Sequence, residues 1–232
     1  MPASQTDGRA MLITSTNPRS PVAEAYRQLR TNIQFSSLDK PVRTLLVTST
    51  SPEEGKSTTL ANLAITIAQT GSTVILVDCD LRRPTVHTLF DISNAKGLTN
   101  LVIDSSATDL PLVESGVSNL RILPSGPQPP NPSEMLGSKR MTEIVEELKS
   151  IADYVLFDSP PVIAVTDAAV LATRVDGVLL VIKAGKTRRE MAQRAKAVLE
   201  KVNANLLGVV LNDVKYDVSL HEYYADQDRS KK

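Results

Sequence analysis

Gly55, Lys56 and Ser57 have the residue types and the spacing needed to hold phosphate groups. They lie between an apolar, β-branched run at 44–48 and a helical pattern at 60–69, so we expect a strand, a loop and a helix. Backbone N–H groups of such a loop converge on phosphate oxygens, while Lys56 would reach the terminal phosphates and the Ser57 hydroxyl would bind Mg²⁺. The loop residues predicted to contact a nucleotide are Pro52, Glu53, Glu54, Gly55, Lys56, Ser57 and Thr58.

Carboxylates follow two further apolar runs. Asp78 and Asp80 end the run at 73–77, and Asp158 ends the run at 154–157. Parallel strands present their carboxyl ends at one edge of a sheet, so these side chains should converge on the phosphate loop. Ser57, Asp78 and Asp158 can organise Mg²⁺ directly or through water. Asp80 is then the candidate to accept a proton from an attacking hydroxyl.

Each signal has a simpler alternative when it is taken alone. The first position of the phosphate-loop pattern, normally glycine, is Thr50, and a helix can begin at a Gly-rich turn without binding anything. A single aspartate at the end of a strand is more often a helix cap or a turn former. Three aspartates converging on a Gly-Lys-Ser loop favour a nucleotide site, and the chemistry indicated is phosphoryl transfer.

The elements that must position these residues alternate between strand and helix patterns. Continuous apolar strands between helices indicate a parallel sheet covered on both faces. We therefore predict a doubly wound α/β P-loop fold with a mostly parallel central sheet flanked by helices. The expected strands are 44–48, 73–80, 120–123, 154–158, 177–182 and 206–211. The expected helices are 20–36, 60–69, 97–102, 133–150, 166–173 and 188–202.

The sequence predicts that the chain is divided into three segments. Residues 1–19 are polar and rich in Ser, Thr and Pro, which predicts a flexible arm. Residues 20–213 form the single expected domain, and Ser20 followed by Pro21 supplies the start of its first helix. Residues 214–232 form a polar tail that holds three of the five tyrosines.

Charge and composition argue against a nucleic-acid-binding protein, a disulfide-bonded protein, a transition-metal protein and a membrane-spanning protein. The formal net charge is zero, which predicts no nucleic-acid partner. The single cysteine, Cys79, excludes an internal disulfide, and two histidines argue against transition-metal chemistry. No apolar run approaches the ~20 residues needed to cross a bilayer. We therefore expect a cytoplasmic protein that reaches the inner face of the cell membrane only through a partner.

The phosphate loop, the stretch at 75–82 and the stretch at 155–158 resemble the Walker A, Walker A′ and Walker B motifs of bacterial tyrosine kinases. The resemblance extends from about residue 20 to residue 212 and includes the sequence Pro-Pro-Asn-Pro-Ser-Glu at 129–134. It implies ATP and Mg²⁺ as cofactors and tyrosine autophosphorylation as the activity.

In that family a Glu-x-x-Arg-x-x-Arg helix builds the interface of a ring, commonly an octamer. The resemblance therefore implies that Glu24, Arg27 and Arg30 form contacts between subunits. Spacing alone shows only that the three side chains share one helix face, which is usually a solvated, salt-bridged surface.

The family phosphorylates tyrosines in its own C-terminal tail, with the tail of a neighbouring subunit entering the active site. This implies Tyr216, Tyr223 and Tyr224 as acceptors. Three tyrosines are fewer than many family tails carry, and packing of Tyr223 and Tyr224 on the sheet edge is the alternative. Arg82 is a candidate phosphate contact, and the alternative is an ordinary surface residue. Asn212 resembles the family's adenine-contacting position, and the alternative is a turn at the end of the last strand.

The resemblance also implies partners. Relatives regulate capsular or extracellular polysaccharide synthesis and export under a membrane-spanning chain-length regulator, fused or separate, together with a cognate tyrosine phosphatase. Two rival functions remain. One is a partitioning ATPase without tyrosine transfer, which usually carries a lysine where this chain has Ser51. The other is a nucleotide-responsive scaffold with vestigial catalysis.

Overall fold

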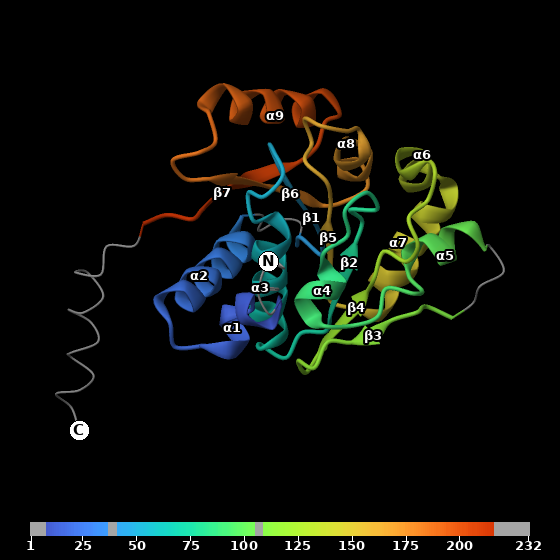
Figure 1. Cartoon of the computed structure of the whole chain (residues 1–232), viewed down its shortest axis with the longest axis horizontal. Helices are drawn as coiled ribbons and strands as arrows, with labels where there is room; N and C mark the ends of the chain where they lie inside the picture. Colours follow the sequence, from blue (N-terminus) through green and yellow to red (C-terminus); the bar gives the residue numbers. More distant parts are fainter. Residues whose placement is uncertain (1–7, 37–40, 105–108, 216–232) are drawn as a thin grey trace, which may run out of the picture.

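A seven-stranded, mostly parallel sheet organises the part of the chain described by the computed structural model, residues 8–36, 41–104 and 109–215 (Figure 1). Its strand order is β3-β4-β2-β5-β1-β6-β7, and only the β3–β4 pair is antiparallel. The strands are β1 Thr44–Ser49, β2 Val74–Asp78, β3 Val113–Glu114, β4 Leu120–Leu123, β5 Tyr154–Asp158, β6 Gly177–Lys183 and β7 Leu206–Asn212. The predicted doubly wound fold is confirmed, and the short strand β3 is an addition to it.

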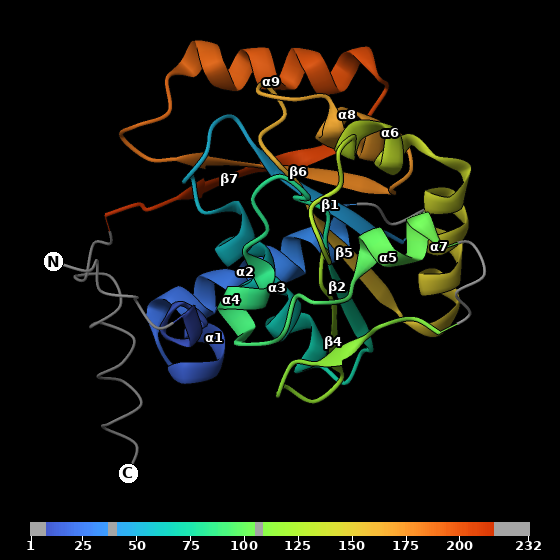
Figure 2. The ribbon, with the colours of Figure 1, turned by 45° about the vertical axis from the view of Figure 1, so that its right-hand side comes forward.

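Helices cover both faces of this sheet (Figures 1 and 2). They are α1 Ile13–Thr16, α2 Pro21–Phe35, α3 Lys56–Ala68, α4 Val86–Phe90, α5 Leu98–Ile103, α6 Pro132–Gly137, α7 Lys139–Ile151, α8 Asp167–Ala172 and α9 Arg189–Lys201, preceded by a 3₁₀ turn, Gly8–Met11. None of the helices in the described residues is long and apolar enough to cross a membrane.

Two hydrophobic cores lie on opposite faces of the sheet, because successive strand residues point in opposite directions. In β1, Leu45 and Val47 belong to the core under α3, whereas Leu46 belongs to the core that includes α7, α8 and α9. The central strands are buried along their whole length. This two-sided burial explains why they read as continuous apolar runs in the sequence.

The prediction of a flexible arm over residues 1–19 is wrong for its described part. Thr14 is fully buried, and its backbone N–H and its hydroxyl both donate to the Oδ1 atom of Asn62, at 3.0 and 2.9 Å. The Asn62 amide donates in turn to the carbonyl of Met11, at 2.9 Å. Asn62 is a fully buried polar side chain on α3, and the N-terminal segment supplies the partners that it requires.

The helix predicted over residues 133–150 is also wrong, since two helices occupy it. Pro132 begins α6, which ends at Gly137, and the Ser138 hydroxyl then accepts the backbone N–H of Met141 to cap α7. Ser133 does not act as a cap, because its hydroxyl contacts Asp167 instead. The Ser20 cap on α2 is confirmed: its hydroxyl accepts the N–H of Ala23 at 3.1 Å.

Candidate functional site

The loop after β1 has the backbone shape of a phosphate-binding turn. Gly55 immediately precedes α3 with φ of +87°, and Glu53 has φ of +62°. Positive φ at two nearby positions turns the chain sharply, and glycine adopts it without steric cost. The loop borders a cavity of about 660 Å³ at the carboxyl ends of the strands. Lining residues include Pro52, Glu53, Gly55, Lys56, Ser57, Thr58, Asp80 and Arg82.

The Lys56 ammonium lies at the centre of the acidic groups. Its Nζ atom is 2.9 Å from the Oδ2 atom of Asp80, 3.4 Å from the Oδ2 atom of Asp158 and 3.1 Å from the Ser57 hydroxyl. Burial alone would lower the pKa of Lys56, but the charges of Asp158 and Asp80 outweigh it, so this pKa is raised. Lys56 is therefore a fixed positive charge beside the cavity.

Asp78 and Asp158 lie directly opposite each other on neighbouring strands, and both are fully buried. Burial, reinforced by the charge of Asp158, raises the pKa of Asp78 to about 8. Burial likewise raises the pKa of Asp158, although Lys56 and the hydrogen bond from the Ser57 hydroxyl oppose this shift. The pair is thus an electrostatically costly arrangement that additional positive charge would stabilise.

Asp78 also organises the backbone that follows it. Its Oδ2 atom accepts the N–H groups of Thr85 and Val86 at the start of α4, at 3.1 and 3.0 Å, and its Oδ1 atom accepts the N–H of Asp80 at 3.2 Å. These bonds fix the turn that carries Asp80 toward Lys56. Sequence reasoning assigned Asp78 to metal binding and missed this positioning contact.

The donor set fits Mg²⁺ better than a cation held by protein side chains alone. In the described part of the chain, no group of three His, Cys, Asp or Glu residues is arranged to hold a metal ion. Mg²⁺ usually keeps several waters and takes one or two protein oxygens besides the phosphates. Ser57 and Asp158 provide such oxygens, and the raised pKa of Asp158 reflects its need for positive charge.

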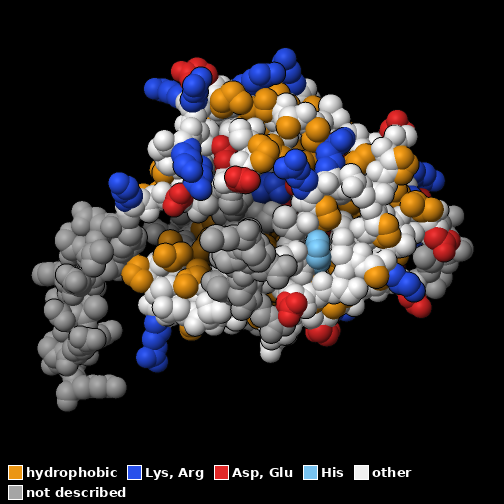
Figure 3. Space-filling view, in the orientation of Figure 1, with side chains coloured by type: hydrophobic (Ala, Val, Ile, Leu, Met, Phe, Trp, Pro, Cys, Tyr) orange, Lys and Arg blue, Asp and Glu red, His pale blue; other side chains and the backbone are white. Residues whose placement is uncertain are grey.

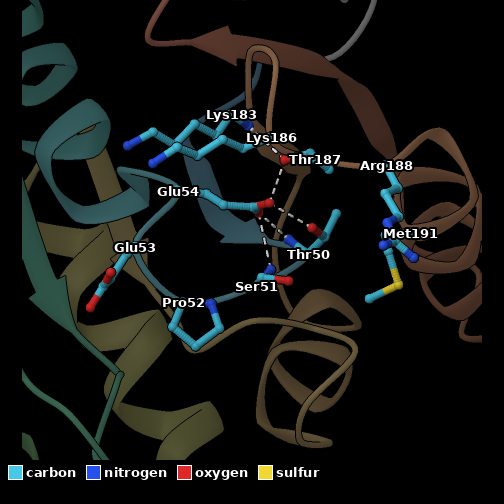
Figure 4. Close-up of a pocket in the computed structure, with 10 residues that line it drawn as sticks. All are labelled: Thr50, Ser51, Pro52, Glu53, Glu54, Lys183, Lys186, Thr187, Arg188 and Met191. Carbon is cyan, nitrogen blue, oxygen red and sulfur yellow. Dashed lines mark hydrogen bonds between the residues drawn. The ribbon is translucent and has the colours of Figure 1, made fainter.

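The Glu54 carboxylate points toward Thr50, Ser51 and Thr187 (Figure 4), and Glu54 is not among the residues that line the cavity of about 660 Å³. The carboxylate accepts the N–H groups of Thr50 and Ser51, at 2.8 and 3.0 Å, and hydroxyl hydrogen bonds from Thr50 and Thr187. Four donors therefore satisfy this buried charge and connect the phosphate loop to the loop after β6. The sequence predicted a nucleotide contact for the residue and gave no signal for this bracing role.

Asn212 supports the loop from the last strand. Its Nδ2 atom donates to the Glu54 carbonyl at 3.0 Å, and a Cβ atom built at Gly55 would lie 2.1 Å from the same nitrogen. Close packing of the amide explains why the position before Lys56 is a glycine. Contact between Asn212 and a nucleotide base stays a prediction.

Gly55→Ala is expected to weaken nucleotide binding by ~10-fold or more, because the new methyl group pushes Asn212 off the loop and the positive φ adds about 1–2 kcal/mol of strain. Gly71→Ala is the matched control, since Gly71 has φ of +94° with nothing within 4 Å of its added Cβ. Calorimetric titration with an ATP analogue separates the two effects. Equal loss of affinity in both variants would contradict the role of the Asn212 contact.

The Arg82 guanidinium forms an ion pair with the buried carboxylate of Asp167 at the border of the cavity of about 660 Å³. Its Nε and Nη2 atoms donate to the two carboxylate oxygens of Asp167, at 2.9 and 3.0 Å. Asp167 is fully buried at the start of α8, and Ser133 contacts the same carboxylate. The predicted phosphate contact of Arg82 thus has a competitor, and the sequence did not reveal the three-residue network.

Glu24, Arg27 and Arg30 share a face of α2 but already have partners within the chain. Arg27 pairs with Glu24 at 2.7 Å and donates to the Pro18 carbonyl through both Nη atoms. Arg30 donates to the Thr66 carbonyl at 2.8 Å. Their role between subunits stays a prediction. The predicted acceptors, Tyr216, Tyr223 and Tyr224, lie outside the described residues.

Comparison with known proteins adds an independent line of evidence. Residues 45–231 match the family described as the CobQ/CobB/MinD/ParA nucleotide binding domain. The chain is 44% identical to the tyrosine-protein kinase YwqD of Bacillus subtilis, over 94% of this chain and 92% of YwqD.

Solved structures point the same way. The chimerical protein CapA2B2 superposes with a TM-score of 0.86 at 36% identity, covering 89% of this chain and 91% of that one. The kinase domain of the Escherichia coli tyrosine kinase ETK superposes with a TM-score of 0.85 at 33% identity, covering 90% and 82% of the two chains.

Proposed function

The chain belongs to the bacterial tyrosine-kinase family of P-loop proteins, and on this premise we propose that it transfers the γ-phosphate of ATP to tyrosines in the tail of a neighbouring copy. The observation that carries the proposal is the contact of Lys56 with Asp80 at the edge of the nucleotide cavity. It joins a phosphate-binding cation to a candidate proton acceptor. ATP hydrolysis would use the same two groups on a water molecule, so the preference for tyrosine transfer rests on the similarity to proteins named tyrosine kinases.

The protein residues divide the work of the transfer. N–H groups of the phosphate loop and Lys56 hold the β- and γ-phosphates and offset their charge. Asp80 accepts the proton of the tyrosine hydroxyl as its oxygen bonds to the γ-phosphorus, and the bond from that phosphorus to the ADP oxygen breaks. Mg²⁺, held by Ser57 and Asp158, would supply charge neutralisation between the phosphates. The products are phosphotyrosine, ADP and one proton.

The direct test maps phosphate on the intact chain. After incubation with Mg²⁺-ATP, peptide mass mapping should find phosphate on Tyr216, Tyr223 or Tyr224, and chelation of Mg²⁺ should prevent it. A variant lacking residues 214–232 should still bind ATP while accepting no phosphate. ADP release without phosphotyrosine, with a membrane activator's cytosolic segment present or absent, would favour the ATPase alternative.

We propose that α2 contributes to a ring of subunits. Changing Glu24, Arg27 and Arg30 together to alanine should convert a large oligomer into smaller species, as measured by multi-angle light scattering. Gln28→Ala, an exposed change on the same helix, is the matched control. Circular dichroism must show an intact fold, because Arg30 also contacts the Thr66 carbonyl. An unchanged molar mass in the folded triple variant would refute the interface.

The cellular setting of the proposal follows from the family. A membrane-spanning polysaccharide chain-length regulator would recruit and activate the kinase at the inner face of the membrane, and a cognate tyrosine phosphatase would reset it. The pathway would be capsular or exopolysaccharide synthesis and export. Arg82 and Asn212 stay proposed nucleotide contacts; Arg82 would have to leave Asp167 to reach a phosphate.

A further inference from the structure

The segment from β6 through α9 is strongly basic in a chain whose formal net charge is zero. Residues 183–201 contain seven Lys or Arg and two Glu, a net formal charge of +5. Lys and Arg side chains are prominent over α9 in the space-filling view (Figure 3). Charge this concentrated beside a candidate active site attracts an acidic partner.

A second cavity, of about 430 Å³, lies where this basic segment meets the phosphate loop (Figure 4). Lys183 and Lys186 lie on one side of the Glu54–Thr187 contact and Arg188 lies on the other; we call these three residues the basic rim. Pro52 and Glu53 border both this cavity and the nucleotide cavity. The two cavities are therefore contiguous across the tip of the phosphate loop.

Few acidic groups offset the basic rim. Glu54 is buried and bonded to four donors, while Asp213 pairs with Lys183 at 3.3 Å. Glu53 is exposed and lines this cavity, and Glu190 is an exposed acid two residues after Arg188. Arg188 occupies the N-cap of α9 without a side-chain cap, so the first N–H groups of this helix add partial positive charge.

The chain itself contains a segment of matching charge. Residues 216–228 carry four Asp or Glu and no Lys or Arg, and all three candidate acceptor tyrosines lie within them. Fully extended, these thirteen residues span about 43 Å, which allows an acidic part to sit at the basic rim while a tyrosine crosses the loop tip.

We propose that the basic rim is the docking surface for the acidic segment 216–228 of a second copy of this chain. The inference rests on the proposed tyrosine-kinase function and adds the feature by which the acceptor is recognised. Acidic residues near the tyrosine bind the basic rim, and Pro52 and Glu53 mark the path by which the tyrosine enters the nucleotide cavity. Recognition is then mainly electrostatic and set by charge pattern.

The test measures phosphorylation, by the full-length chain, of a synthetic peptide spanning the acidic residues 216–228, which excludes the flanking Lys215, Arg229, Lys231 and Lys232. The double variant Lys186→Glu, Arg188→Glu should raise the KM for this peptide by ~10-fold, with kcat and the KM for ATP within about twofold of wild type. Both substituted side chains are exposed, and Arg188, although at the N-cap position of α9, forms no side-chain cap hydrogen bond, so the fold should be retained. The matched control, Lys96→Glu with Lys139→Glu, makes the same charge change at exposed positions elsewhere.

A charge-swapped peptide with Asp226→Lys and Asp228→Lys should bind the reversed variant better than the wild type. Added salt should raise the KM of the wild type and leave that of the double variant nearly unchanged. An unchanged peptide KM in the double variant, or an equal rise in the control, overturns the docking surface. Failure of the wild type to phosphorylate any tail peptide overturns the proposed function instead.

Discussion

Asp80→Asn is expected to lower tyrosine phosphorylation by ~10²–10⁴-fold while the protein still binds nucleotide. Asp80 is 4% exposed, borders the nucleotide cavity and lies 2.9 Å from the Lys56 ammonium. Asparagine keeps an oxygen that can accept the N–H of Arg83, as the Asp80 Oδ1 atom does at 3.0 Å, so the turn should survive. The amide cannot take up a proton, and the transfer step loses its base.

Single-turnover phosphorylation and calorimetric ATP titration, made on the same preparations, check this prediction. Asp109→Asn, an exposed aspartate, is the matched control and should behave as the wild type. Parallel loss of ATP affinity and activity would mean that Asp80 shapes the site rather than acting as the base. Full activity in Asp80→Asn would exclude it from proton transfer.

Lys56→Met is expected to reduce phosphotyrosine by ~10³-fold or more and to weaken ATP binding, because the apolar side chain cannot offset the γ-phosphate charge. Methionine is similarly long and unbranched, so the volume is nearly kept. Lys139→Met, at a 93% exposed side chain, is the control. Wild-type levels of phosphotyrosine in Lys56→Met would remove the phosphate loop from the reaction.

The same substitution should change how stability depends on pH. The pKa of Asp78 is raised from 3.8 to about 8 in the folded chain, so between these values the folded state binds more protons than the unfolded state. The free energy of unfolding therefore falls as pH rises from about 4 to about 8. Loss of the Lys56 charge raises the carboxyl pKa values further, and the fall should be steeper in Lys56→Met by thermal denaturation.

Sequence reasoning reached the fold and the placement of the acidic groups because both depend on local signals. A buried strand that ends in a carboxylate has a recognisable pattern. The structure does bring Asp80 and Asp158 to the Lys56 ammonium. Asp78 lies beside them and accepts the backbone N–H of Asp80. The mostly parallel sheet also follows from alternating strand and helix patterns, whereas the order of its strands was not predicted.

Three of the missed features depend on contacts between distant residues. Thr14 looks like part of a polar arm until Asn62, buried on α3, is known to need a partner. Glu54 and Thr187 are 133 positions apart, and Arg82 and Asp167 are 85 apart, so no short pattern predicts either pair. The break after Gly137 was missed because both halves of the stretch favour helix.

The deep burial of α3 predicts that this helix unfolds locally less often than the other helices. Twelve of its thirteen residues are buried, because the N-terminal segment and α2 cover the side facing away from the sheet, whereas α9 buries only Ala195 and Leu199. Amide hydrogen exchange should therefore be slowest in α3 and approach the global unfolding limit, while α9 exchanges through smaller openings. The phosphate loop is thus attached to α3, the helix expected to open least often. The basic rim instead adjoins α9, which is expected to open more often.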